Sequence, residues 1–279
     1  MKRSLSVLIL LVALVSCNSG QEFRYLDNTR AVAAVANESG ITSPVTFHVI
    51  YDNYVKNNEL EADWGFSVLV SGLPETILFD TGTNPDIFLS NFRKMNLDAS
   101  GIDYLVLSHE HGDHTGGIPG FIQLKKGIPA VIPSAFSRQF KNSLVDYSFK
   151  PLLVRQPAQI CENLFTSGEF TEPLSEHALV MNTSRGLVVV TGCSHPGIIN
   201  MLKKIRSDFG KNVYLVFGGF HLMDKPDNEV NAIISEMKSM GVVKCGATHC
   251  TGDHQIDLFR KAFGENFVEM GVGNAIVVN

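Results

Sequence analysis

The sequence of 279 residues predicts an α/β fold, because short strand-like runs alternate with segments of helical periodicity. Residues 187–190 and 213–217 are apolar, largely β-branched runs, and glycine follows each of them closely. Between these two runs, apolar residues recur at helical spacing until Gly210 stops the pattern. With 44% hydrophobic and 18% charged residues, the chain can bury a full core.

The first part of the chain is expected to open with strands before its first helix. Four apolar runs are typical of strands: 45–51, 66–71, 76–80 and 102–107. Gly72-Leu73-Pro74 predicts a turn between the second and third of these runs. Asn84 followed by Pro85 predicts the start of a helix over 85–95, because proline suits the first helical turn.

The second part of the chain predicts three helices that each end at a glycine. They begin at Pro196, at Glu229 with Asn228 as the cap, and at Gln255, and a strand over 274–278 closes the chain. Residues 122–176 are the least regular segment, with prolines and mixed polarity. Irregular inserts often carry specificity, so we expect this segment to form the rim of a substrate site.

The most informative segment is 108–117, where four metal-capable side chains fall within six positions: His109, His111, Asp113 and His114. Their spacing does not suit one helix face, on which partners recur three or four residues apart. It suits a tight loop after the strand over 102–107, where imidazole and carboxylate ligands can converge on zinc. A solvated histidine-rich turn is the alternative, but the apolar strand and glycine-rich flanks argue against it.

Three later strand-like runs also end in a histidine. His195, His221 and His249 each follow such a run and a few small or polar residues. Ligands gather outside the carboxyl ends of strands in open sheets, so these ends can deliver their side chains to one place. The sequence therefore predicts a metal site built from several strand ends.

These motifs resemble the metallo-β-lactamase superfamily. The segment over 77–83, Ile-Leu-Phe-Asp-Thr-Gly-Thr, and the His-x-His-x-Asp-His stretch are similar to its first motifs. Trp64-Gly65-Phe66-Ser67, Thr-Gly-Cys-Ser-His over 191–195, Gly-Gly-Phe-His-Leu over 218–222 and Thr-His-Cys-Thr-Gly over 248–252 resemble one subgroup. That subgroup is named after dihydropterin ribofuranosyl-aminobenzene phosphate synthase. The resemblance runs from about Val45 to the C-terminus and implies a four-layer αββα sandwich with metals at one edge.

The resemblance also implies roles for the site residues. His109, His111 and His195 would hold one metal, and Asp113, His114 and His249 a second. Zinc is expected, as one or two ions per chain, with iron or manganese as alternatives. Asp80 would orient a ligand loop rather than bind metal. The bridging aspartate of many superfamily hydrolases is absent after the run 187–190, so the second ion could be differently liganded or missing.

Three further residues near these motifs keep alternative roles. His221 either replaces a ligand or acts as a catalytic general acid and substrate contact, and we favour the catalytic role. Cys193 and Cys250 could be ligands, supports of the ligands, a reactive pair or a disulfide, and we favour supporting roles. His48, His177 and His254 lack such context and are expected at the surface or in packing.

Three functions follow from this pattern. The first is a hydrolase of a small phosphorylated or cyclic ester that uses a metal-activated hydroxide, with Asp113 as a catalytic residue. The second is a transferase or synthase like the one that names the subgroup, whose cytosolic pathway fits poorly with export. The third is a non-catalytic metal-binding surface lipoprotein. A small-molecule substrate is expected, and a net charge of −5 gives no reason to expect nucleic acid.

The N-terminus predicts an exported protein. A basic start and an apolar run over 5–15 fit a signal peptide over 1–16 and are too short for a membrane span. The residues before Cys17 resemble a lipoprotein cleavage box, so Cys17 would carry lipid and anchor the protein to the bacterial cell envelope. An ordinary signal peptide is the alternative. Residues 17–44 would then be a tether and 45–279 the folded domain, while the oligomeric state is left open.

Overall fold

The computed structural model describes residues 22–279. The predicted signal peptide over 1–16 and the lipidation site at Cys17 lie outside these residues, so both stay predictions. Across residues 22–279, none of the helices has the length and apolar character that crossing a membrane requires.

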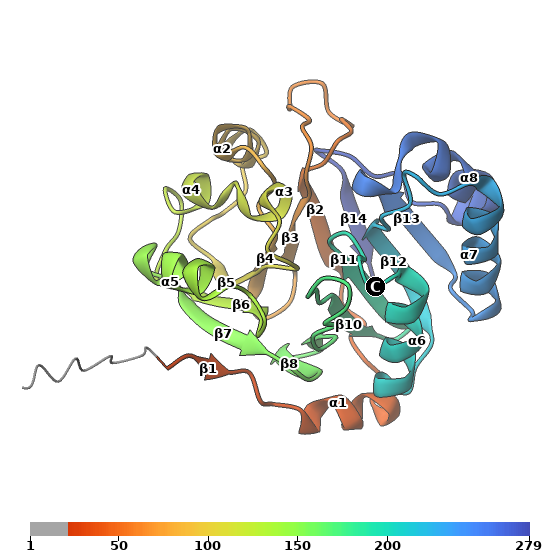
Figure 1. The fold of residues 1–279 in the computed structure, drawn as a ribbon, viewed down its shortest axis with the longest axis horizontal. Coiled ribbons are helices and arrows are strands. Elements are labelled where there is room, and N and C mark those ends of the chain that lie inside the picture. Colours follow the sequence, from red (N-terminus) through yellow and green to blue (C-terminus); the bar gives the residue numbers. More distant parts are fainter. Residues whose placement is uncertain (1–21) are drawn as a thin grey trace, which may run out of the picture.

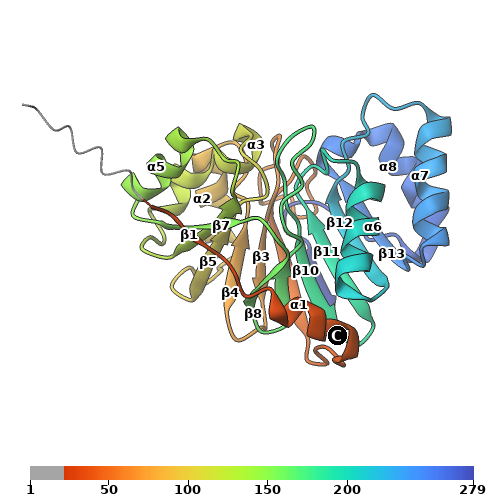
Figure 2. The same ribbon diagram turned by 60° about the horizontal axis from the view of Figure 1, so that its bottom comes forward.

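Two β-sheets pack face to face, and helices cover the outer face of each sheet (Figures 1 and 2). The eight-stranded sheet has the order β1 (Arg24–Tyr25), β7 (Lys150–Val154), β6 (Pro129–Pro133), β5 (Ile102–Val106), β4 (Thr76–Phe79), β3 (Ser67–Ser71), β2 (Val45–Tyr51) and β14 (Ala275–Val278). The six-stranded sheet has the order β13 (Lys244–Thr248), β12 (Val213–Gly219), β11 (Gly186–Thr191), β10 (Leu179–Thr183), β9 (Leu164–Thr166) and β8 (Ala158–Cys161). The predicted four-layer αββα sandwich is confirmed.

The helices divide between the two outer faces. Those on the eight-stranded side, labelled in Figure 1, are α2 (Pro85–Lys94), α3 (Gly112–Thr115), α4 (Ile118–Phe121) and α5 (Arg138–Asp146). Those on the six-stranded side are α1 (Arg30–Ala34), α6 (Ile198–Phe209), α7 (Asp227–Ser239) and α8 (Asp253–Phe263). Three short 3-10 turns complete the elements: η1 (Val35–Asn37), η2 (His249–Thr251) and η3 (Gly264–Asn266).

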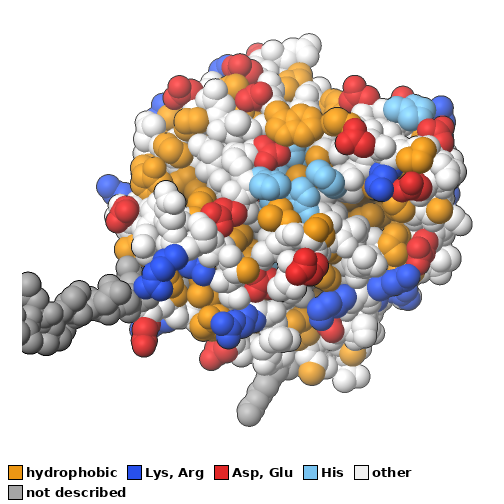
Figure 3. Space-filling model, in the orientation of Figure 1, with side chains coloured by type: hydrophobic (Ala, Val, Ile, Leu, Met, Phe, Trp, Pro, Cys, Tyr) orange, Lys and Arg blue, Asp and Glu red, His pale blue; other side chains and the backbone are white. Residues whose placement is uncertain are grey.

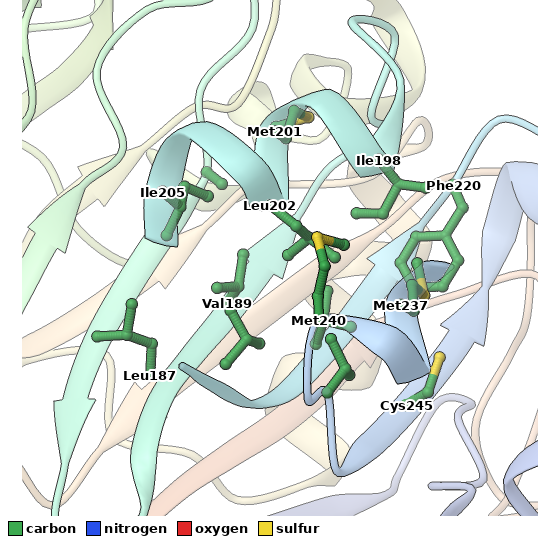
Figure 4. Packing of buried hydrophobic residues seen from close by; sticks show 14 of the residues in the cluster. Leu187, Val189, Ile198, Met201, Leu202, Ile205, Phe220, Met237, Met240 and Cys245 are labelled. Carbon is green, nitrogen blue, oxygen red and sulfur yellow. The ribbon is translucent and has the colours of Figure 1, made fainter. Parts of the chain in front are cut away.

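Three hydrophobic clusters hold these layers together. The cluster between the sheets joins residues of both, as in the edge-to-face contact of Phe47 on β2 with Phe217 on β12, whose ring centres are 5.1 Å apart. A second cluster lies under α6 and α7, where Leu202 faces Val189 of β11 (Figure 4). The third packs α2 and α4 on the eight-stranded sheet. Each sheet therefore has two buried faces, as its apolar strands require.

The local signals for helix ends explain most element boundaries. The Asn84 side chain accepts hydrogen bonds from the amides of Asp86 and Ile87, as a capping residue should. Gly210 ends α6 in the left-handed region at φ 64°. The prediction of Asn228 as a cap is wrong, because α7 begins at Asp227, directly after the extended Pro226.

The expectation that residues 122–176 are irregular is also wrong, whereas their role at the rim of a substrate site stays a prediction. This segment contains β6, α5, β7, β8 and β9, and it contributes Val131 and Val154 to the cluster between the sheets. Its prolines mislead the sequence analysis because Pro129 and Pro133 occupy the two ends of β6.

Residues 22–44 pack on the domain and do not form the expected tether. β1 pairs in parallel with β7, and Ile41 pairs with Thr183 next to β10 and β11. Val32 and Val35 are buried in the cluster beneath α6. The alanine- and valine-rich composition of this segment buries apolar area, which a free tether could not do.

The topology brings several strand ends to one edge of the sandwich. β11, β12 and β13 are mutually parallel, and β4 and β5 are parallel in the other sheet. Their carboxyl ends lie at the seam between the two sheets, and the predicted ligands follow these ends.

Candidate metal centre

The first ligand loop runs from β5 into α3 and is held by the buried carboxylate of Asp80. Asp80 Oδ1 accepts from the amide of Ser108 at 2.7 Å, and Oδ2 accepts from the Ser108 hydroxyl at 2.7 Å. Asp80 Oδ2 also lies 2.7 Å from Nδ1 of His114, so the Nε2 atom of that ring is aimed into the site. Asp80 therefore orients the loop, in the position that the sequence analysis assigns to a supporting residue.

One group of ligands consists of three imidazoles. The rings of His109, His111 and His195 have mutual centre-to-centre distances of 4.8, 4.8 and 4.9 Å. His109 and His111 come from the first loop, whereas His195 comes from the end of β11. The structure thus brings together the three residues predicted for one metal.

The second group combines Asp113, His114 and His249. Asp113 Oδ2 lies 3.2 Å from Nε2 of His249 and 3.7 Å from Nε2 of His114. The sulfur of Cys193 lies 3.2 Å from His114 Nε2. Ligand atoms of all four residues lie within 4.8 Å of one another, which is the spacing of groups around one cation.

Three imidazole nitrogens in this region lack any hydrogen-bond partner within residues 22–279. They are the buried Nε2 atoms of His109, His195 and His249, of which the last has only its ion-pair contact of 3.2 Å with Asp113 Oδ2. A buried polar atom without a partner is costly, and here all three belong to residues of the two ligand groups. Divalent cations such as zinc take neutral imidazole nitrogens as ligands, so these residues fit the metal that the sequence predicts.

The electrostatics of the site favour a positive charge. Burial, together with the neighbouring His221 and His111 rings, lowers the pKa of His195 to about 3. Burial also lowers the pKa of His114, but the carboxylates of Asp80 and Asp113 outweigh it and raise the value to about 9. Burial raises the pKa of Asp113, yet the His249 and His114 rings hold it below its usual range. The centre therefore contains an ionised carboxylate surrounded by imidazoles.

Cys193 lies among the ligand atoms rather than behind them. Its sulfur belongs to the group with Asp113 and to a group with His109 and His195. This position between the two groups suits a shared thiolate ligand, whereas the sequence analysis favours a supporting role. It also gives the chain a candidate bridging ligand where the sequence lacks the aspartate.

Glu176 holds the loop that carries two of these ligands. Its fully buried carboxylate accepts hydrogen bonds from three successive amides, those of Cys193 at 2.9 Å, Ser194 at 2.8 Å and His195 at 2.8 Å. Burial raises the pKa of Glu176 to about 7, while the three amides oppose that shift. The sequence analysis missed this residue, because nothing in the sequence around it marks a distant carboxylate as a support.

Asn53 and Trp64 support residues of the second ligand group. Asn53 Oδ1 lies 2.9 Å from Nδ1 of His249, and it also accepts from the amide of Gly65. The indole nitrogen of Trp64 donates to Asp113 Oδ2 at 3.0 Å, and its ring lies 4.9 Å from that of His249. Trp64 therefore forms part of the rim of the site.

Backbone strain collects around these ligands. Four of the non-glycine residues with positive φ are Asp80 at 54°, Ser194 at 61°, His221 at 52° and His249 at 52°. Such conformations cost free energy and persist where the surrounding structure imposes them, often at functional sites. Each of the four is a ligand, a support or a direct neighbour of one in the sequence or in space.

His221 lies beside the first group and is exposed, whereas Cys250 is buried. The ring of His221 is 4.3 Å from that of His195, and Cys250 is buried beneath it. Both line a pocket of about 270 Å³ together with Trp64, Met223, Asp224 and Lys225. Figure 3 shows the histidines in a hollow on this face, bordered by hydrophobic and acidic side chains. All four cysteines within residues 22–279 are free thiols.

The remaining histidines are away from the ligand groups. His254 is exposed and paired with Asp227, and His48 is half-buried against Ser71. His177 is fully buried, with Nε2 3.0 Å from the carbonyl of Leu107 and Nδ1 2.6 Å from the Thr166 hydroxyl. The surface and packing roles expected for these three residues agree with these contacts.

Comparison with known proteins identifies relatives of this fold and site. Residues 65–193 match the family model of the metallo-β-lactamase superfamily. The 7,8-dihydropterin-6-methyl-4-(β-D-ribofuranosyl)-aminobenzene-5'-phosphate synthase of Methanocaldococcus jannaschii is 28% identical, covering 85% of this chain and 98% of the synthase. An uncharacterised protein of the same organism is 29% identical, over 77% of this chain and 93% of its own.

Solved structures agree with these sequence matches. Tm1679, described as a metal-dependent hydrolase of the β-lactamase superfamily, has 28% identity and a TM-score of 0.71, covering 83% of this chain and 98% of its own. The metallo-β-lactamase fold protein YhfI of Bacillus subtilis has 18% identity and a TM-score of 0.64, covering 85% of this chain and 100% of its own, and supports the fold alone. The chain therefore has the fold of the metallo-β-lactamase superfamily, matches its family model over residues 65–193 and resembles the dihydropterin ribofuranosyl-aminobenzene phosphate synthase subgroup.

Proposed function

We propose that this protein is a metal-dependent enzyme of the synthase type, which joins a phosphorylated ribofuranosyl-aminobenzene compound to a second substrate instead of transferring a group to water. The metal dependence rests on one observation above the others, the three buried Nε2 atoms without partners that belong to two adjacent ligand groups. The synthase chemistry rests on the 28% identity that extends over 98% of the synthase of M. jannaschii.

The residues divide the work between holding cations and holding the substrate. His109, His111 and His195 would hold one cation, and Asp113, His114 and His249 a second, with the Cys193 sulfur between them. When bound, such cations supply Lewis-acid polarisation of substrate oxygens and activate water. Asp113 carries the negative charge of the second group, so it is the residue whose loss should stop the reaction.

His221 is placed to contact a substrate. It is exposed, lines the pocket beside the ligand groups and lies next to the ring of His195. While no cation is bound to its imidazole, His221 can from this position donate a proton to a leaving group or bind a substrate oxygen. Trp64 and Lys225 line the same pocket and offer an aromatic face and a positive charge to a phosphorylated ring compound.

Hydrolysis by the same centre is the second candidate function. The specific observation in its favour is the similarity to Tm1679, described as a metal-dependent hydrolase, at a TM-score of 0.71 and 28% identity. The two functions differ in the acceptor, since water replaces the second substrate in a hydrolase. An acceptor competition experiment therefore separates them.

The test uses the purified full-length protein, whose metal content is first measured by elemental mass spectrometry. It is then supplied with a ribofuranosyl-aminobenzene phosphate, with and without a dihydropterin whose 6-methyl carbon carries a leaving group such as diphosphate, and products are identified by mass spectrometry. A parallel panel contains phosphodiester, phosphomonoester, lactone and β-lactam substrates. A joined product of the dihydropterin and the aminobenzene compound that disappears with chelator would support the synthase function.

The other outcomes are equally clear. Chelator-sensitive turnover of one compound class in the hydrolysis panel, with no joined product, would replace the synthase with the hydrolase. Metal bound at two ions per chain without turnover in either assay would favour a non-catalytic metal-binding protein. Less than one bound metal per chain would contradict the metal centre itself.

We also propose that the protein is exported and anchored through a lipid on Cys17. This proposal rests on the sequence pattern of residues 1–17. The Cys17→Ser variant should leave the membrane fraction of expressing bacteria, while the unchanged chain should remain in it. Equal distribution of the two forms would contradict the anchor.

A further inference from the structure

We propose a third metal site in this protein, formed by Cys193, His221 and Cys250, that takes a thiophilic d10 cation such as zinc or cuprous copper. It lies beside the two ligand groups described above and shares Cys193 with them. The proposal depends on the proposed function only through Cys193, the thiolate that the third site shares with the metal centre. The other two ligands, His221 and Cys250, belong to neither of the two groups assigned to the centre.

The geometry of the three residues is that of a ligand set. Their two sulfur atoms and an imidazole nitrogen all lie within 4.8 Å of one another. They come from the carboxyl ends of three neighbouring parallel strands, β11, β12 and β13. Parallel strands end at the same sheet edge, so the convergence follows from the topology and not from a flexible loop.

The chemistry of this set differs from that of its neighbours. The first two groups consist mainly of imidazoles and a carboxylate, which suit zinc, iron and manganese. Two thiols and one imidazole form a softer set, which selects zinc and monovalent copper over manganese or magnesium. Three protein ligands also leave a fourth position for water or an exogenous ligand.

The backbone around Cys250 is arranged to admit its sulfur. A Cβ atom added to Gly219 would lie 2.6 Å from Cys250 Sγ and 2.5 Å from the carbonyl oxygen of Gly192, so only glycine fits there. Within η2, His249 joins the group with Asp113, whereas its neighbour Cys250 joins the group with His221. His221 and His249 both have left-handed backbone conformations. Such conformations are strained in residues other than glycine and are often found at functional sites.

The site is accessible from solvent. His221 is exposed, and both His221 and Cys250 line the pocket of about 270 Å³ that opens beside Trp64. A cation can therefore approach His221 and Cys250 from this pocket, without passing through the two imidazole-rich groups. In contrast, Cys161 and Cys245 are buried thiols outside any ligand group found in residues 22–279.

Cadmium is the probe for this site, because it is a d10 cation and its thiolate complexes absorb in the near ultraviolet. Metal-free full-length protein, kept reduced with a phosphine, is saturated with cadmium and freed of excess by gel filtration. Bound cadmium is counted by elemental mass spectrometry, and the thiolate absorbance is recorded on the same sample. The unchanged chain is compared with Cys250→Ser, His221→Gln and the matched control Cys161→Ser.

The third site predicts three cadmium ions in the unchanged chain and in Cys161→Ser. Cys250→Ser and His221→Gln should each bind two, and Cys250→Ser should lose the absorbance of one of two thiolates. Equal stoichiometry and equal absorbance in all four proteins would overturn the proposal. Circular dichroism of each variant identifies a loss that comes from misfolding, and His221→Gln keeps the test valid if Cys250→Ser fails to fold.

Failure of the third site is distinguishable from failure of the proposed function. If all four proteins bind two ions and the unchanged chain turns over substrate, the centre stands and the third site falls. If the unchanged chain binds three ions and has no activity, the third site stands and the enzymatic function falls. A disulfide between Cys193 and Cys250 would appear as two thiols lost to alkylation without the phosphine, and its presence with phosphine would also overturn the proposal.

Discussion

The two sides of the metal centre are built in different ways. On the eight-stranded side, four candidate ligands share one short loop, and Asp80 supports that loop through Ser108 and His114. On the six-stranded side, ligands arrive from separate strand ends. Glu176 holds the loop of His195, and Asn53 contacts His249.

This difference has a mechanical consequence. A shared loop moves as one unit, so the loss of its support should displace several ligands at once. Separate strand ends should lose ligands individually, because each rests on its own support and on a rigid strand. Four substitutions test this contrast, and they are ordered from the largest expected effect to the smallest.

Asp113→Ala should abolish turnover and lower the metal content of the whole centre. The Asp113 carboxylate belongs to the group with His249 and also to a group with His109 and His111, so its loss affects both sides. Metal content and turnover are measured on the same preparation, with circular dichroism to establish that the fold is kept. Glu110→Gln is the matched control, since Glu110 bonds to Ser137 and belongs to neither group. Retained activity in Asp113→Ala would remove this residue from the centre.

Asp80→Asn should weaken metal binding more than Glu176→Gln does. Supports of metal ligands typically contribute about 10- to 100-fold in affinity, and we place Asp80 at the upper end and Glu176 near the lower end. Asp80 orients the loop of four ligands, whereas Glu176 orients the loop of Cys193 and His195. Competition with a chromogenic chelator gives both affinities, and the cobalt spectrum of each variant reports ligand geometry. Equal losses in the two variants would contradict the contrast between a shared loop and separate ends.

Asn53→Ala should lower metal affinity by about 10-fold, the smallest loss among the supports. Among the candidate ligands, Asn53 orients His249, through a contact of 2.9 Å at Nδ1. The same chelator competition measures this effect. A loss as large as that of Asp80→Asn would mean that the strand ends are coupled, and that the second side also behaves as one unit.

His177 connects the two sides, and its removal should flatten the pH dependence of stability. Burial lowers its pKa from 6.5 to about 4, so the folded state holds the neutral ring. The stabilisation is complete above pH 6.5 and is lost as the pH falls toward 4, because the unfolded chain then binds the proton more tightly. Between pH 7 and pH 5 the contribution is about 2 kcal/mol.

Urea unfolding of metal-free protein at both pH values measures this contribution. His177→Gln should be less stable than the unchanged chain at pH 7, since it loses the contacts to Leu107 and Thr166. Its further loss on going to pH 5 should be smaller by about 2 kcal/mol. If the free energy of unfolding changes equally between pH 7 and pH 5 in the two proteins, His177 does not keep its neutral form in the fold.

The sequence predicts the first side of the centre far better than the second. The loop over 109–114 is contiguous and follows a recognisable strand, so its ligands and Asp80 can be assigned from motifs. The strand ends of His195 and His249 are recognisable because parallel strands share one edge. The overall αββα fold follows from the same alternation and the family resemblance.

The supports on the second side cannot be found in this way. Glu176 acts on amides 17 to 19 residues away and Asn53 on an imidazole 196 residues away, and neither lies in a local motif. Only the folding of the chain brings these two residues next to the ligands. The prediction of irregular structure over 122–176 is wrong for a related reason. Its prolines suggest loops, but two of them occupy the ends of β6, where a sheet tolerates proline.

The seam between the two sheets has a thermodynamic consequence for the whole molecule. His109 and His111 come from one half of the sandwich and His195 from the other, so a cation held by all three cross-links the halves. Any ion that binds this arrangement and not the unfolded chain raises the free energy of unfolding by mass action, by roughly 2.7 kcal/mol at one hundred times its dissociation constant. The melting temperature of this protein therefore reports on the free metal concentration around it.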